Sequence, residues 1–138
     1  MNWIYNGNPF TEEDANSYYG FVYEIVNLTN NKRYIGRKYL SKAKTITVKG
    51  KKKKTRVSSD WINYWSSSDE VKADVKLLGE HNFTRTILYL CNSRSECNYL
   101  ETKEIFLKDA LLSENYYNKW VSCKIHKAHV LNKGIYGS

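Results

Sequence analysis

The chain has 138 residues, of which 41% are hydrophobic and 14% are aromatic. This length and composition fit a single globular domain and exclude a disordered chain. The formal net charge is +8, and no apolar run approaches the roughly 18 residues that predict a transmembrane helix.

The positive charge is concentrated in one part of the sequence. Residues 1–24 contain four acidic residues and no lysine or arginine, whereas residues 25–59 contain twelve basic residues and no acidic one. Residues 60–138 contain ten of each sign. A basic block of this kind is the usual footprint of a polyanion partner. We therefore expect a nucleic-acid partner and no membrane partner.

The cysteines indicate a reducing compartment. The three of them, Cys91, Cys97 and Cys123, are too few and odd in number for a disulfide framework. The first residues also lack a basic segment followed by an apolar one, so a secretory signal is not expected. We expect an intracellular, cytoplasmic protein.

The first elements in chain order are an acidic leader and a hairpin. Residues 1–17 are predicted to be irregular, with Thr11-x-x-Asp14 opening a helical turn. Residues 20–38 follow as two strands rich in aromatic and β-branched residues, joined by an asparagine-rich turn.

Tyr23 and Tyr34 lie eleven positions apart in this hairpin. Because side chains alternate along a strand and paired residues point the same way, any even-numbered loop places both phenols on one face. An odd loop or a bulge would separate them. Two interpretations are open at this point, a functional site or simple cross-strand aromatic packing.

A basic segment, residues 41–57, comes next and includes four consecutive lysines after Gly50. It is either a mobile loop or a second, smaller hairpin turning at Lys49-Gly50. A solvated charge run is one interpretation, but its position directly after the tyrosine hairpin favours docking onto phosphate.

The second half of the chain is predicted to alternate helices and a strand. Ser59-Asp60 can cap a short helix with Trp61, Tyr64 and Trp65 on one face, although these aromatic side chains can instead stack on bases. Ser67-x-x-Glu70 reads as a capping box for a helix that Gly79 closes. A strand over 83–90 precedes a helix from Ser93 to about Leu112, and a strand or turn at 116–118 and a basic tail at 121–138 end the chain. This order predicts an α+β fold, a small three-stranded antiparallel sheet with helices packed on it.

The triplets Phe21-Val22-Tyr23 and Tyr34-Ile35-Gly36 resemble the signature of the GIY-YIG nuclease family. The resemblance covers roughly residues 18–120 and is closest to small phage-type and homing-endonuclease-like members. The first triplet departs from the pattern, because its glycine, Gly20, stands one place early. The resemblance implies the same three-stranded architecture, a DNA substrate, one divalent metal ion, and a phage-infected host cell as the location if the chain is phage-encoded.

Phosphodiester hydrolysis needs a carboxylate for the metal ion, and the helix 94–112 offers Glu101 and Glu104. Helical periodicity, with a stripe of Leu100, Phe106, Leu107, Ala110 and Leu111 expected to be buried, places Glu104 nearer the core. The residues around the family's metal-binding glutamate match Glu101 better, so we place Glu101 first and keep Glu104. Either carboxylate could instead form a surface pair with Lys103 or Lys108. One carboxylate suits Mg²⁺, or Mn²⁺, which keeps several waters.

The remaining site residues follow from chemistry and resemblance together. Tyr23 is the predicted proton acceptor, and Tyr34 is predicted to orient water or phosphate, or to relay the proton. The family's arginine has no counterpart in the expected helix near Trp61. Arg56 is therefore the first candidate cation because a guanidinium matches phosphate geometry, with Lys38 or Arg37 as the others. Asn118, matching the family's terminal asparagine, either holds the active-site backbone or shapes a turn.

The basic residues are also predicted to bind nucleic acid, and those we single out are Arg37, Lys51, Lys52, Lys53 and Lys54. The sequence thus predicts a metal-dependent endonuclease acting on duplex DNA, helped in its specificity by a homodimer or a partner protein. The first alternative is a nucleic-acid-binding module without catalysis. A weaker alternative is an interaction protein whose tail is held by zinc at Cys123, His126 and His129.

Overall fold

The computed structural model describes residues 1–124, 126 and 127. The described chain is an α+β domain with one five-stranded sheet, in the order β2-β1-β7-β3-β4, and a separate two-stranded hairpin, β5-β6. The elements are β1 (Ile4–Tyr5), β2 (Asn8–Pro9), α1 (Glu12–Ala15), β3 (Gly20–Asn27), β4 (Lys32–Tyr39), β5 (Ser41–Val48), β6 (Lys51–Ser58), α2 (Asp69–Leu78), β7 (Phe83–Cys91) and α3 (Arg94–Leu107). Short 3₁₀ turns at Trp61–Asn63 (η1) and Glu80–Asn82 (η2) flank α2.

The predicted three-stranded sheet is only the centre of the observed one. Strands β7, β3 and β4 are antiparallel neighbours as expected. The prediction was wrong in stopping there, because β1 pairs parallel to β7 and β2 pairs antiparallel to β1. Each added strand is two residues long, which is too short to show the alternating pattern from which strands are predicted.

The leader is consequently part of the core. Trp3 is 1% exposed, and its ring centroid lies 4.7 Å from that of Phe21 and 5.1 Å from that of Tyr23. Its indole Nε1 donates to the carbonyl of Trp61 at 2.8 Å. The helical turn predicted at Thr11-x-x-Asp14 is confirmed as α1, with both hydrogen bonds of the capping box present.

The β3-β4 hairpin has the predicted parity. Residues 28–31 form its loop, an even number, and the register pairs Tyr23 with Gly36 and Ile25 with Tyr34. Tyr23 and Tyr34 therefore lie on the same face of the sheet.

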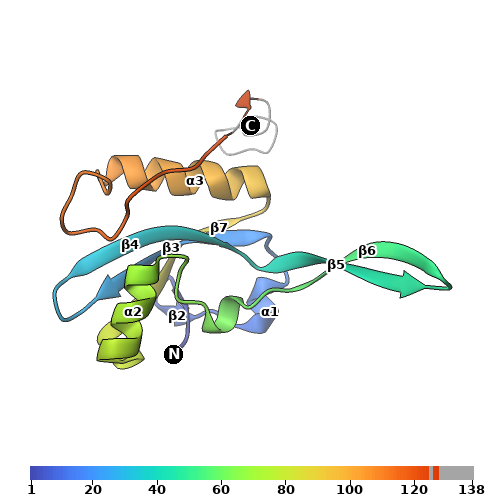
Figure 1. Cartoon of the computed structure of the whole chain (residues 1–138), viewed down its shortest axis with the longest axis horizontal. Helices are drawn as coiled ribbons and strands as arrows, with labels where there is room; N and C mark the ends of the chain where they lie inside the picture. Colours follow the sequence, from blue (N-terminus) through green and yellow to red (C-terminus); the bar gives the residue numbers. More distant parts are fainter. Residues whose placement is uncertain (125, 128–138) are drawn as a thin grey trace.

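The two faces of the sheet are covered by different helices, with α3 on one side and α2 on the other (Figure 1). The face toward α2 holds the larger core, which includes Phe21, Tyr23, Ile25 and Val71. The face toward α3 holds a smaller core around Val22, Ile35 and Cys97. The tyrosine pair belongs to the α2 side, while α3 approaches from the other side.

The predictions for the start of α2 and for a helix at 61–65 need correction. The N-cap of α2 is Ser68, whose side chain accepts from the Val71 amide, so Ser67 is not the cap; the closing Gly79 is confirmed. The helix expected at 61–65 is only the 3₁₀ turn Trp61–Asn63.

The helix α3 begins after Ser93 as predicted but ends at Leu107 rather than near Leu112. Its expected stripe was wrong at Phe106 and Leu107, which are 60% and 65% exposed, although Ala110 is buried and Leu100 packs against the smaller core. The buried residues of α3 are instead Cys97, Glu101, Glu104 and Ile105. The two glutamates are buried because each meets a polar partner in the sheet, which hydrophobic periodicity cannot anticipate.

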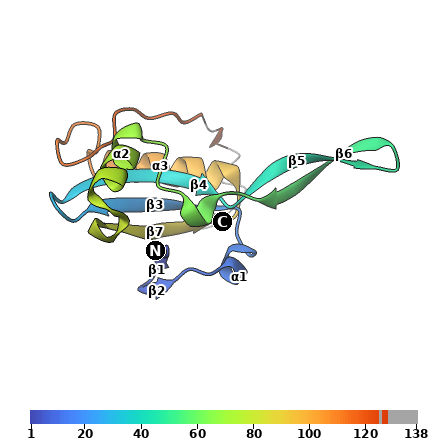
Figure 2. The same cartoon turned by 60° about the horizontal axis from the view of Figure 1, so that its bottom comes forward.

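The basic segment is a hairpin rather than a mobile loop. Lys49 and Gly50 form its turn with φ of 51° and 76°, the left-handed pair of a tight hairpin turn. Strands β5 and β6 extend beyond the end of the main sheet, away from α2 and α3 (Figure 2). Among the described residues, no helix is long and apolar enough to span a membrane.

We expect Trp3→Ala to lower the free energy of unfolding by about 3–5 kcal/mol, because it empties a buried site between the leader and the sheet. Urea denaturation followed by circular dichroism measures this. Leu77→Ala is the matched control, since Leu77 is 80% exposed, and its effect should stay within about 0.5 kcal/mol. An equally small effect for Trp3→Ala would contradict the placement of the leader in the core.

Candidate active site

Tyr23 and Tyr34 form the centre of the candidate site, with ring centroids 6.2 Å apart. They fit because the residue opposite Tyr23 is Gly36. A Cβ on Gly36 would lie 2.4 Å from the Tyr23 hydroxyl oxygen and 2.9 Å from Cε2 of Tyr34. The absence of a side chain at Gly36 therefore allows the Tyr23 ring to lie across β4.

Gly20 meets a different restriction. A Cβ there would lie 2.7 Å from the carbonyl oxygen of Lys38 and 2.8 Å from the sulfur of Cys97. The strand β3 thus needs glycine where it passes between β4 and α3, one position before the triplet in which the family pattern has it.

The Tyr23 side chain is wholly buried. Its hydroxyl has no hydrogen-bond partner within the part of the chain that the structure describes. Burial raises the pKa of Tyr23 well above its ordinary value, and the neighbouring phenols of Tyr64 and Tyr34 add to the rise. The phenol is therefore held in its neutral form.

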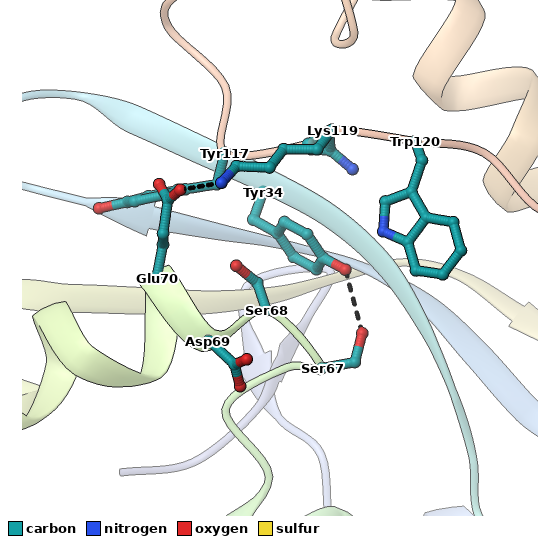
Figure 3. Close-up of a pocket in the computed structure, with 9 residues that line it drawn as sticks. Tyr34, Ser67, Ser68, Asp69, Glu70, Tyr117, Lys119 and Trp120 are labelled. Atoms are coloured by element: carbon teal, nitrogen blue, oxygen red, sulfur yellow. Dashed lines mark hydrogen bonds and ion pairs between the residues drawn. The ribbon is translucent and has the colours of Figure 1, made fainter.

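Tyr34 is the phenol that faces solvent. It lines a cleft with Ser67 and the N-terminal residues of α2, and its hydroxyl lies 3.2 Å from Ser67 Oγ (Figure 3). Burial raises the pKa of Tyr34, and the hydrogen bond with Ser67 partly offsets that rise.

Glu101 meets Arg37 in an adjoining cleft of about 390 Å³, which Tyr34 also lines. Arg37 Nη1 donates to Glu101 Oε1 at 2.5 Å. Burial raises the pKa of Glu101, and the Arg37 guanidinium opposes this rise. The carboxylate of α3 and the phenol of β4 thus meet at the outer edge of the sheet, because β4 is its last strand.

Glu104 lies elsewhere, although it is equally buried. It accepts a hydrogen bond from the hydroxyl of Tyr89 on β7 at 2.6 Å and is not among the residues that line either cleft. The structure therefore brings Glu101, and not Glu104, together with Tyr34.

Of the candidate cations, Arg37 lines the cleft with Tyr34 and Glu101, whereas Lys38 and Arg56 do not. Lys38 Nζ lies 4.0 Å from the ring centroid of Tyr64 and 2.5 Å from Asp60 Oδ1, on the side of the sheet that holds the tyrosine pair. Arg56 lies on β6, where it donates to the side chain and carbonyl of Ser41, and it lines neither cleft. Lys51, Lys52, Lys53 and Lys54 are exposed on the β5-β6 hairpin.

Asn118 holds the backbone of β4. Its side chain accepts from the Ile35 amide at 3.0 Å and donates to the Ile35 carbonyl at 2.8 Å. The neighbouring Tyr117 amide donates to the carbonyl of Arg33 at 2.7 Å. Segment 115–118 therefore completes the outer edge of β4 beside Tyr34, as one of the two interpretations of Asn118 expects.

Sequence analysis did not assign Ser67 or Trp120 to the site. Ser67 resembles a helix cap in sequence, but in the structure its hydroxyl faces Tyr34. Trp120, 79% exposed, lines both clefts. No local pattern in the sequence identifies either residue, because each is brought beside Tyr34 by the tertiary fold from a distant part of the chain.

Only part of the predicted zinc cluster lies within the residues that the structure describes. Cys91, Cys97 and Cys123 are free thiols, and within residues 1–124, 126 and 127 no group of three metal-ligating side chains is present. His129 lies outside the described residues.

Comparison with known proteins gives a family for the chain. Residues 3–121 match the family model described as "Putative endonuclease segE, GIY-YIG domain". The chain belongs to the GIY-YIG family. It is also 34% identical over 102 residues to "Putative endonuclease segE" of Enterobacteria phage T4, an alignment that covers 72% of this chain. The chain spans 40% of the length of that relative. No solved structure matches.

We expect Gly36→Ala to lower the free energy of unfolding of this GIY-YIG domain by about 1–3 kcal/mol, because the new methyl group overlaps the Tyr23 ring. A double-mutant cycle with Tyr23→Ala, measured by urea denaturation, tests the cause. In the Tyr23→Ala background most of the cost of Gly36→Ala should disappear. A cost that is unchanged there would assign the effect to the backbone instead.

We also expect Arg37→Gln to raise the pKa of Glu101 further, because the variant keeps the burial and loses the opposing charge. A folded-state pKa above the ordinary value means that this carboxyl contributes less stability as pH rises from its ordinary pKa through the raised one. Carbon-13 NMR titration of the metal-free protein measures the shift. Arg33→Gln, which breaks the pair with Glu24, should leave Glu101 unchanged, and an unshifted or lower pKa in Arg37→Gln would contradict the assignment.

Proposed function

We propose that this protein is a metal-dependent endonuclease that hydrolyses phosphodiester bonds of duplex DNA, by nicking or cleaving. The observation that carries the proposal is the meeting of Tyr34, Arg37 and Glu101 in one cleft at the edge of the sheet. These three side chains supply a phenol, a guanidinium and a carboxylate, which can take part in proton transfer, charge stabilisation and metal binding in phosphodiester hydrolysis.

Glu101 is the proposed ligand of one Mg²⁺ or Mn²⁺ ion. It is an anionic oxygen donor that lines an open cleft, and a site with a single carboxylate suits an ion that keeps several waters. When bound, the ion supplies positive charge at the scissile phosphate. Glu104 is the weaker candidate, because it lines neither cleft and its carboxylate accepts from Tyr89.

Tyr34 is the phenol proposed to contact the substrate. In hydrolysis, a water oxygen forms a bond to phosphorus, the bond from phosphorus to the leaving oxygen breaks, the water gives up a proton, and the leaving oxygen takes one up. Tyr34 lines both clefts, so its hydroxyl is proposed to orient that water or the phosphate and to pass on the proton. Ser67 holds the hydroxyl at the edge of the cleft.

Tyr23 keeps its proposed role as proton acceptor under one condition. Because burial holds the phenol neutral, it must lose its own proton before it can accept one from water, and positive charge close by would favour that phenolate form. Lys38 is the proposed source of that charge, since its ammonium lies over Tyr64, whose ring packs edge-on against Tyr23 at 6.1 Å between centroids.

Arg37 is the proposed phosphate-binding cation. Its guanidinium already lies in the cleft with Tyr34 and Glu101, and a planar guanidinium suits phosphate. Arg56, the first candidate from sequence, is a weaker choice because its donors bind Ser41 at the base of the hairpin. Asn118 is proposed to act as a positioning residue through the β4 backbone.

The phage T4 relative supports this proposal, because it is named a putative endonuclease. A homodimer or a partner protein is proposed to add specificity, and the free cysteines fit an intracellular location, in a phage-infected cell if the chain is phage-encoded.

A nucleic-acid-binding module without catalysis is the second candidate. It is favoured by the pairing of Glu101 with Arg37 and by the complete burial of Tyr23. Such a protein would bind DNA with a steep salt dependence and never cut it.

Incubation of supercoiled plasmid with protein and Mg²⁺, with an EDTA control, separates the two functions. We expect nicked or linear product when the protein is incubated with Mg²⁺, and none when EDTA is added. The variant Glu101→Gln should reduce the rate by at least about a hundredfold, since even residues around metal ligands are worth about 10–100-fold, and should still bind DNA.

Glu104→Gln is the matched control, because it is the same change in an equally buried glutamate of α3. It should keep most of the cleavage, provided that circular dichroism shows it folded. Equal cleavage by both variants would overturn the metal assignment. If the unmodified protein leaves the plasmid intact, the endonuclease proposal fails and the nucleic-acid-binding module without catalysis is favoured.

A further inference from the structure

The β5-β6 hairpin, here called the arm (residues 41–58), is unlike the rest of the molecule in its packing. Its two strands pair only with each other, and all but Ser41, Ile46 and Val57 are exposed. Neither core cluster contains a residue of the arm. The arm therefore adds nothing to the core, and its sequence is free to serve another purpose.

The charge of the arm is of one sign. Its residues include eight basic side chains and no acidic one. In the described part of the chain, no ion pair involves any of these eight. Like charges so close on a ribbon repel one another. Because the described part of the domain gives them no ion-pair partner, we expect their anionic partner to come from another molecule.

The register distributes these charges over both faces of the arm. Lys51 and Lys53 pair with Val48 and Ile46 and share one face, whereas Lys52 and Lys54 pair with Thr47 and Thr45 and share the other. A ribbon that lay flat on a surface would need cations on one face only. Cations on both faces suit a position between two rows of phosphate.

The dimensions of the arm fit such a position. Eight residues per strand give a length of about 26 Å at roughly 3.3 Å per residue. The major groove of B-DNA, about 12 Å wide and 8.5 Å deep, admits a two-stranded ribbon. The arm continues directly from β4, the strand of Tyr34 and Arg37 (Figures 1 and 2), so a duplex held by the arm is also held near the cleft.

We propose that the arm is a duplex-DNA docking element that lies in the major groove, with its two faces toward the phosphates on either side. This deepens the proposed function, since it rests on duplex DNA being the substrate. Lys52 and Lys54 contact one row of phosphates, and Lys51 and Lys53 contact the other.

The test compares two doublets on the same strand that differ only in face, Lys51→Ser/Lys53→Ser and Lys52→Ser/Lys54→Ser. Binding of a short mixed-sequence DNA duplex is followed by fluorescence anisotropy in EDTA over a range of salt concentrations. Each doublet should weaken binding at least about tenfold and reduce the slope of log K against log salt by about 2, because each lost phosphate contact is worth about 0.9.

The doublet Lys76→Ser/Lys108→Ser is the control, since it removes equal charge from exposed positions of α2 and the end of α3. It should leave the slope unchanged. Loss of affinity in only one arm doublet would overturn the groove position in favour of flat docking, and loss in neither would overturn the arm as a DNA element.

Double-stranded RNA of the same sequence is the second probe. Its major groove is too deep and narrow for such a ribbon, so we expect it to bind more weakly and to respond less to both arm doublets. Equal behaviour of RNA and DNA would overturn the groove position. Because these binding measurements need no cleavage, the two proposals can fail separately. The binding assay can overturn the role of the arm while the plasmid assay shows activity, and the plasmid assay can show no activity while the arm binds DNA.

Discussion

The close approach of the Tyr23 ring to Gly36 is the contact on which the rest of the site depends. Because no Cβ stands in the way, the ring lies across β4 and packs between Trp3, Tyr64 and Tyr34. Tyr34, two positions before Gly36, is then held beside it with its hydroxyl at the edge of the sheet. A site of this kind needs an edge strand, and β4 is one.

The edge position explains how groups from opposite faces of the sheet meet. Tyr34 belongs to the α2 side and Arg37 to the α3 side, yet both line the cleft with Glu101. Segment 115–118 closes the free edge of β4 by hydrogen bonds to Arg33 and Ile35. The backbone there is consequently satisfied, which protects an edge strand from pairing with another chain.

Electrostatic conditions differ sharply over this short distance. The phenol of Tyr23 is kept neutral by burial, whereas Glu101 keeps a guanidinium beside it. A buried carboxylate without that partner would favour its protonated form. In the arm, in contrast, the four lysines of β6 are exposed and have no ion-pair partner among the described residues, so their charge is available to another molecule.

Local patterns in the sequence predicted the hairpin and the caps of α1 and α3, because each depends on residues close together in the chain. The shared face of the two tyrosines was predicted on the condition of an even loop, and the turn at Lys49-Gly50 was one of two alternatives. The residues around the family's metal-binding glutamate supplied the choice of Glu101 over Glu104. The tertiary structure alone decided that Trp3 joins the core, that Ser67 faces Tyr34, that Arg37 rather than Arg56 lies in the cleft, and which side of α3 is buried. These contacts join residues far apart in sequence, and hydrophobic periodicity misassigned α3 because its buried face carries two glutamates whose partners lie on other strands.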